Sequence, residues 1–220
     1  MASSPASMLS ALQLDVLRAF FARERGFFLT GGGALAGFHL GHRPTDDLDL
    51  FTDDAAAFER GRFVLEAVAA ELGAGLEVRQ AAPLFKRFVL TRPEAGVVVD
   101  LVCDRGPQLV RDKPEHGGIR VDPPEEILAN KLTTVVGRAE ERDLVDLLHL
   151  ERAGYRIESG LDAALAKDGG CTPATLAWIL SEIVIPDGVS LPGGISAAEL
   201  RAFVDDLVRR LRRAALPPAG

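Results

Sequence analysis

Few cysteines and no long hydrophobic run occur in this sequence, and both absences limit what the protein can be. The 220 residues include two cysteines, Cys103 and Cys171, which form neither a CxxC pair nor a zinc-binding spacing. A disulfide scaffold is therefore excluded, and both thiols are expected to be buried in a reducing, cytoplasmic environment. Because no run of about eighteen apolar residues is present, we also expect no membrane-spanning segment and no membrane partner.

An excess of positive charge is absent as well. The formal net charge is −7, which argues against indiscriminate binding to nucleic acid but leaves room for a local basic groove. Hydrophobic residues make up 47% of the chain and charged residues 26%, the proportions of an ordinary globular protein and not of a disordered one. A chain of this length can bury a core large enough to fold without disulfides or a structural metal.

The predicted secondary structure divides the chain into two parts. In the first part, apolar spacing and turn residues predict helices and short strands at 9–20, 27–30, 48–51, 55–72, 76–78, 85–90 and 96–103. In the second part the signals are almost all helical, with helices predicted at 123–137, at 138–152, from 173 and from 197. We therefore predict an α+β fold, with a mixed α/β core over residues 1–120 and a helical domain over residues 121–220.

Residues 28–51 hold the first feature that points to chemistry. A short apolar strand runs into three glycines at 31–33, which are followed by a short helix, a turn and a second strand. Glycines between a strand and a helix N-terminus let backbone N–H groups approach an anion such as phosphate. Asp47 and Asp49 stand two residues apart in the second strand and therefore share one face of it. Such a carboxylate pair can hold Mg²⁺ against a triphosphate.

Two further charged residues interrupt apolar patterns. Asp100 lies within a run of valines and leucines, where a buried carboxylate must be neutralised by a metal, an arginine or a proton. If its strand lies beside that of Asp47 and Asp49, three carboxylates converge as in two-metal nucleotidyl transfer. Lys131 falls in the apolar stripe of its predicted helix, where it either meets an anion, such as the γ-phosphate of a nucleotide, or extends along the helix to water.

These motifs resemble, in order, the signature of the AbiEii/AbiGii-type nucleotidyltransferases, the toxin components of type IV toxin–antitoxin systems. That signature reads roughly GGTAL, GHR and S-x-D-I-D-L-F. The matching segments here are Gly31-Gly32-Gly33-Ala34-Leu35, Gly41-His42-Arg43 and Thr45-Asp46-Asp47-Leu48-Asp49-Leu50-Phe51. A second block of the family, a lysine helix followed by an R…KD…D helix, is similar to residues 126–132 and 138–146. The last seventy or so residues match no pattern of the family.

The resemblance implies a DNA polymerase β-like nucleotidyltransferase core followed by a helical bundle that closes the nucleotide cleft. It implies Mg²⁺-dependent transfer of a nucleoside monophosphate from an NTP to an acceptor hydroxyl, with two ions expected. The acceptor is expected to be RNA, in particular tRNA, or a protein, and a cognate antitoxin is an expected partner.

The resemblance and the residue patterns together suggest roles for individual residues. Asp47 and Asp49 are assigned to metal, with Asp100 as the third carboxylate, and Lys131 is assigned to the triphosphate. Asp143 matches a functional aspartate of the second block. The nucleotide-binding assignments are Gly31, Gly32, Arg43, Thr45 and Lys131. Arg43 either braces the turn before the aspartate pair or reaches a phosphate. Gly33 replaces the family's usual Thr or Ser, and Thr45 replaces a common Ser.

Three other interpretations compete with this one. The glycines also fit the dinucleotide fingerprint GxGxxA, but only a dozen or so residues separate them from Pro44, too few for a full crossover helix. A small-molecule nucleotidyltransferase, modifying an aminoglycoside or lincosamide antibiotic, would use the same chemistry with a closed polar pocket in the helical half. A non-catalytic nucleotide-binding module with a decayed site is the third, and the intact Asp47, Asp49, Asp100 and Lys131 argue against it.

Overall fold

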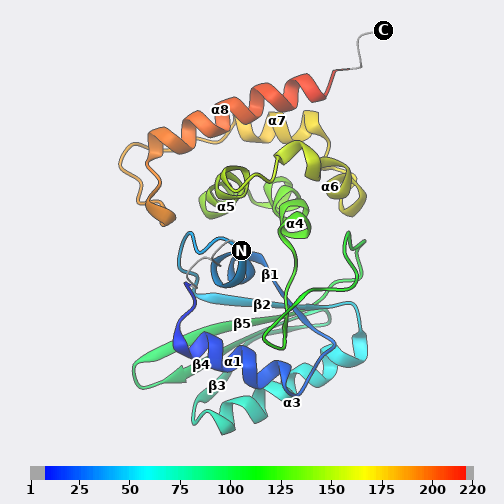
Figure 1. Ribbon diagram of the computed structural model, residues 1–220, viewed down its shortest axis with the longest axis vertical. Coiled ribbons are helices and arrows are strands. Elements are labelled where there is room, and N and C mark those ends of the chain that lie inside the picture. Colours follow the sequence, from blue (N-terminus) through cyan, green and yellow to red (C-terminus); the bar gives the residue numbers. More distant parts are fainter. Residues whose placement is uncertain (1–7, 217–220) are drawn as a thin grey trace. The chain divides into compact units, whose positions relative to one another are not determined.

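The computed structural model describes residues 8–216, which form two compact units. The first unit extends to Gly106 and includes Val110–Pro123, and the second comprises Pro107–Leu109 and the chain from Pro124 onward. Figure 1 shows a sheet with helices in the first unit and helices alone in the second. Within the described residues, no helix combines the length and the apolar character needed to cross a membrane.

A five-stranded mixed sheet forms the centre of the first unit. Its strands are β1 (Phe28–Thr30), β2 (Asp47–Thr52), β3 (Gly75–Ala82), β4 (Phe85–Arg92) and β5 (Ala95–Cys103), in the spatial order β1-β2-β5-β4-β3. β2 and β5 are parallel, and the other neighbouring pairs are antiparallel. β5 therefore lies in the middle of the sheet, as its apolar sequence predicts. Because β1 runs antiparallel to β2, the glycine motif does not belong to a dinucleotide-binding βαβ unit.

Two helices cover one face of this sheet. These are α1 (Ala11–Phe21) and α3 (Ala55–Glu71), both of which contact β5 (Figure 1). Leu48, Leu50, Val99 and Leu101 are fully buried on the covered face, each contributing roughly 1.5–3 kcal/mol by leaving water. Side chains alternate between the two faces of a strand, so Asp47, Asp49 and Asp100 project from the opposite face. The hydrophobic core thus fixes which face carries the carboxylates.

The segment between β1 and β2 begins as a short helix. α2 (Gly31–Ala34) continues into a π-helical turn at Leu35–His39, and the chain then reaches β2. A small hairpin of β6 (Glu115–His116) and β7 (Ile119–Arg120) completes the unit. Its strands are only two residues long, too short to produce an alternating apolar pattern, so the sequence indicates only turns in this segment.

The second unit contains five α-helices within the described residues: α4 (Pro124–Gly137), α5 (Glu141–Arg152), α6 (Leu161–Lys167), α7 (Pro173–Ser181) and α8 (Ala197–Ala214). α4 contacts α5, α6 and α7, and α8 packs along α7. α8 begins where the sequence predicts a helix, and Ser196 and Glu199 form a capping box at its start. The predicted start of a helix at Arg138 is wrong: Ala139 has a φ of 48°, so α5 begins only at Glu141. Both cysteines are buried and free, as expected.

Candidate active site

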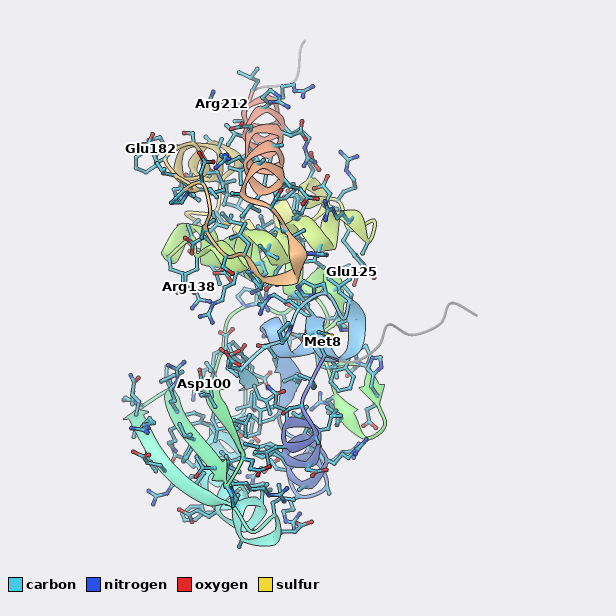
Figure 2. The ribbon with its side chains drawn as sticks, turned by 90° about the vertical axis from the view of Figure 1, so that its left-hand side faces the viewer. Met8, Asp100, Glu125, Arg138, Glu182 and Arg212 are labelled. Carbon is cyan, nitrogen blue, oxygen red and sulfur yellow. The ribbon has the colours of Figure 1, made fainter. Side chains whose placement is uncertain are left out.

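The parallel pairing of β2 with β5 brings the three predicted metal-binding aspartates to one face of the sheet. In this register Asp49 lies directly opposite Asp100, and Asp47 lies opposite Val98. Asp47 and Asp49 are partly exposed, whereas Asp100 is only 4% exposed. Figure 2 labels Asp100 at the sheet of the first unit. The three carboxylates were expected to converge if the strand of Asp100 lies beside that of Asp47 and Asp49, and the pairing of β2 with β5 meets this condition. We call the face that carries these three residues the acidic face.

An arginine neutralises the buried member of the acidic face. Arg87 on β4 is the cross-strand neighbour of Asp100, and its Nε and Nη2 donate hydrogen bonds of 2.8 and 2.6 Å to the two carboxylate oxygens. The hydrogen bond to Asp100 raises the pKa of the Arg87 guanidinium above its ordinary value; burial opposes this rise, and the charges of Asp100, Asp47 and Asp49 add to it. The sequence required that a metal, an arginine or a proton neutralise Asp100, and in the structure an arginine, Arg87, does so.

The glycine turn packs against the acidic face. Gly31 has a φ of 62°, a backbone conformation that favours glycine, and a Cβ built there would overlap a carboxylate oxygen of Asp49. A Cβ at Gly32 would lie 3.0 Å from Nη2 of Arg43 and 3.3 Å from Oγ1 of Thr45. The two glycines thus permit Asp49, Arg43 and Thr45 to approach the backbone closely.

The loop before β2 is held by polar contacts that orient Asp47. Thr45 Oγ1 donates a 2.8 Å hydrogen bond to Asp47 Oδ1, and the Gln13 side chain on α1 donates to the Thr45 carbonyl oxygen at 2.8 Å. Thr30 lies opposite Asp49 in the β1–β2 register, and its buried Oγ1 has no hydrogen-bond partner among the described residues. A buried hydroxyl without a protein partner leaves hydrogen-bonding capacity for water or a ligand.

In the second unit, Lys131 meets carboxylates of its own chain. Its Nζ lies 2.8 Å from Asp143 Oδ1 and 2.6 Å from Asp146 Oδ2, and both aspartates are fully buried. Arg138 adds a 3.2 Å contact from its Nε to Asp143 Oδ2. Burial alone would lower the pKa of Lys131, but the charges of Asp146 and Asp143 outweigh it and raise that pKa. Of the two alternatives that the sequence left open for Lys131, the structure contains the contact with anions, and these are Asp143 and Asp146.

Sequence reasoning missed Arg87 as a member of the site. Arg87 stands in an alternating strand, where an arginine on one face looks like any solvent-exposed residue. Only the β4–β5 register, which the sequence does not specify, shows that it faces Asp100. Asp146 was visible only as part of an arginine- and aspartate-rich helix, and its contact with Lys131 depends on how α4 packs against α5.

Replacing Gly31 by alanine should reveal how closely the glycine turn and Asp49 approach each other. Gly73 has a similar φ of 59° but open space around its Cβ position, so Gly73→Ala measures the backbone strain alone, about 1 kcal/mol. Gly31→Ala adds the overlap with Asp49, and we expect it to lower the free energy of unfolding by at least about 1 kcal/mol more than the control. Urea denaturation measures both; equal costs would contradict the close approach.

Removing the Lys131 charge should destabilise the protein strongly. Lys131→Met leaves two buried aspartates without this partner, and we expect a loss of about 3–5 kcal/mol in the free energy of unfolding at pH 7. At that pH the ion pairs contribute fully, because the raised pKa of Lys131 is crossed only in strongly alkaline solution. Arg209→Met, which breaks an exposed pair with Asp206, is the control and should cost less than about 1 kcal/mol. A small loss for Lys131→Met would contradict the buried ion-pair arrangement.

Several solved structures share this arrangement of strands and helices, and some of them are nucleotidyltransferases by their names. MenT4, a nucleotidyltransferase toxin from Mycobacterium tuberculosis, is 17% identical, with a TM-score of 0.55 over 94% of this chain and 83% of that one. JHP933 from Helicobacter pylori is 20% identical, with a TM-score of 0.54 over 94% of this chain and 96% of that one. At these identities the likeness shows a shared fold. No curated protein matches the sequence significantly.

The family model provides the stronger statement. The model of the nucleotidyl transferase AbiEii toxin of the type IV toxin–antitoxin system matches residues 15–216, which includes both units and every residue of the acidic face. The resemblance seen in the motifs is thereby confirmed, and so is the nucleotidyltransferase fold. The chain belongs to the AbiEii family of nucleotidyltransferase toxins.

Proposed function

We propose that this nucleotidyltransferase uses Mg²⁺ to transfer a nucleoside monophosphate from an NTP to a hydroxyl of a macromolecular acceptor, either tRNA or another RNA or protein. The observation that carries the proposal is the register of β2 and β5, with Asp49 opposite Asp100 and Asp47 on the same face. The family match supports nucleotidyl transfer. The three carboxylates are side chains that can hold the metal ions that such transfer uses.

The side chains present suit magnesium. Mg²⁺ in nucleotide-dependent enzymes is commonly held by one or two carboxylates together with substrate phosphates, and Asp47 and Asp49 offer such a pair. Across residues 8–216, no three His, Cys, Asp or Glu side chains are close enough together to hold a metal by themselves. With substrate phosphates as further ligands, we propose Asp47 and Asp49 as the principal protein ligands, and Asp100, which is paired with Arg87, as the third carboxylate. When bound, magnesium would activate the attacking hydroxyl and stabilise charge on the transferred phosphoryl group.

The glycine turn and its neighbours are proposed to bind the nucleotide. Arg43 is 6% exposed and packs against Gly32, where its guanidinium can neutralise phosphate charge, a role for which its planar fork is suited. Thr45 holds Asp47 in position through its 2.8 Å hydrogen bond. These contacts support a phosphate-binding role for Gly31, Gly32 and Arg43, and an orienting role for Thr45.

Lys131 and Asp143 are proposed to contribute charge and orientation, respectively. Lys131 carries a positive charge that burial does not remove, because Asp146 and Asp143 raise its pKa. We propose that this charge acts on the triphosphate, as the family resemblance implies, and that Asp143 holds the ammonium group in position through the 2.8 Å contact.

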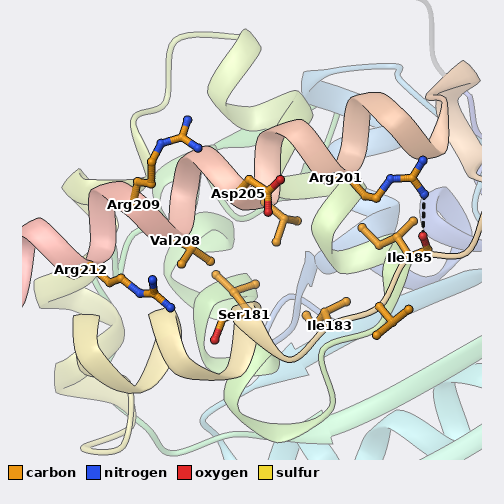
Figure 3. A pocket seen from close by; sticks show the side chains of 11 residues that line it. Ser181, Ile183, Ile185, Arg201, Asp205, Val208, Arg209 and Arg212 are labelled. Atoms are coloured by element: carbon orange, nitrogen blue, oxygen red, sulfur yellow. Dashed lines mark hydrogen bonds between the residues drawn. The ribbon is translucent and has the colours of Figure 1, made fainter.

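A small cationic acceptor is less well supported. The second unit contains a groove of about 510 Å³ between α8 and the end of α7. Its floor is apolar, and its charged residues are three arginines and one aspartate: Arg201, Arg209, Arg212 and Asp205 (Figure 3). An aminoglycoside is a cation and needs an acidic lining, so this groove does not offer such a site. The proposal of a macromolecular acceptor rests on the motif resemblance, and this groove does not favour the small cationic alternative.

Replacing Asp47 by asparagine tests this proposal. We expect Asp47→Asn to lower the rate of nucleotide transfer at least about a hundredfold, because it removes a metal-binding charge while the size of the side chain is kept. Incubation with each radioactive NTP, Mg²⁺ and total cell RNA identifies the labelled acceptor. The matched control is Asp46→Asn, an exposed neighbour that should keep full activity. Undiminished labelling by the Asp47 variant would contradict the proposed site.

A further inference from the structure

Arg87 lies in a row of polar residues that crosses the five strands of the sheet. The register places Thr30 opposite Asp49, Asp49 opposite Asp100, Asp100 opposite Arg87, and Arg87 opposite Gln80. Register partners in neighbouring strands point to the same side, so this row lies on the acidic face. Arg87 is the one cation of a row that otherwise contains two carboxylates, a hydroxyl and an amide.

The contact between Arg87 and Asp100 uses both oxygens of the carboxylate. The two parallel hydrogen bonds, 2.8 and 2.6 Å, form the bidentate geometry that is strongest between arginine and a carboxylate. The Asp100 side chain is 5% exposed, so an added cation must compete with this guanidinium for the same oxygens. The Arg87 side chain itself is 44% exposed and has room to move away.

We propose that Arg87 is a positioning residue that holds Asp100 and competes with the divalent metal ion for it. This inference rests on the proposed function, because it requires a metal site at Asp47 and Asp49. Arg87 offsets the charge of Asp100 and so allows this carboxylate to stay buried in the folded protein. In the absence of a nucleotide, it also lowers the affinity of the acidic face for metal ions. Release of Asp100 is then linked to substrate binding, because the phosphates offer the exposed guanidinium an alternative anion of matching geometry.

The residue beside Arg87 provides a matched control. Lys86 is adjacent in β4, but its ammonium pairs with Glu59 at 3.0 Å and lies 4.4 Å from the centre of the Phe58 ring, both on α3. It therefore projects from the covered face of the sheet. Lys86→Gln removes the same unit of charge as Arg87→Gln, at nearly the same place in the sequence, without touching Asp100.

The test is the affinity of the full chain for Mn²⁺ alone, measured by electron paramagnetic resonance of the free ion. We expect Arg87→Gln to bind Mn²⁺ about tenfold more tightly than the wild type, and Lys86→Gln to stay within about twofold of it. Arg87→Gln should also melt at a lower temperature without metal, and Mn²⁺ should raise its melting temperature more than that of the wild type. Lower stability with unchanged Mn²⁺ affinity would show a structural ion pair only and would overturn the proposal.

The Asp100→Asn background decides whether Arg87 acts through Asp100. Adding Arg87→Gln to Asp100→Asn should bring no further gain in Mn²⁺ affinity; a gain as large as in the wild type would mean that the arginine acts only as a distant charge. Asp47→Asn separates the two proposals. If Mn²⁺ binding does not depend on Asp47, the proposed metal site is wrong; if it does, but Arg87→Gln binds like the wild type, only the inference about Arg87 fails.

Discussion

The parallel pairing of β2 with β5 is the constraint on which the acidic face depends. In that register Asp49 of β2 and Asp100 of β5 lie side by side on one face of the sheet. The leucines and valines at alternate positions pack against α1 and α3 on the other face. A shift by one residue would place the carboxylates in the core and the apolar side chains in water. The burial of Leu48, Leu50 and Val99 therefore fixes the position of the chemical groups.

Each buried carboxylate among the described residues is accompanied by a cation from its own chain. The pairs are Glu24 with Arg60, Asp100 with Arg87, Asp122 with Lys113, Glu126 with Lys167, and Asp143 and Asp146 with Lys131. Such pairing avoids the cost of an isolated buried charge. Asp47 and Asp49 differ in that they remain partly exposed, which leaves them accessible to solvent and to ions. Asp47 and Asp49 are thus the carboxylates of the acidic face that are most open to a ligand, whereas Asp100 is held by Arg87.

Much of the fold could be predicted from the sequence, because glycines, caps and apolar spacing act locally. The strands around Asp49 and Asp100 and the start of α8 after Ser196 follow from such local patterns. The partners of these residues could not be predicted, since they depend on strand register and helix packing. Arg87 and Asp146 are the clearest cases: each stands in an unremarkable pattern, and only the tertiary structure brings it to its partner.

The most direct test of the account is the position of a metal ion on the acidic face. Anomalous diffraction from crystals containing Mn²⁺ and a non-hydrolysable NTP would locate the ion without relying on activity. The account predicts a peak at about 2.0–2.2 Å from carboxylate oxygens of Asp47 and Asp49, with the nucleotide phosphates on the side of Gly31 and Gly32. A nucleotide bound with its metal elsewhere, and with these two aspartates uncoordinated, would contradict the account.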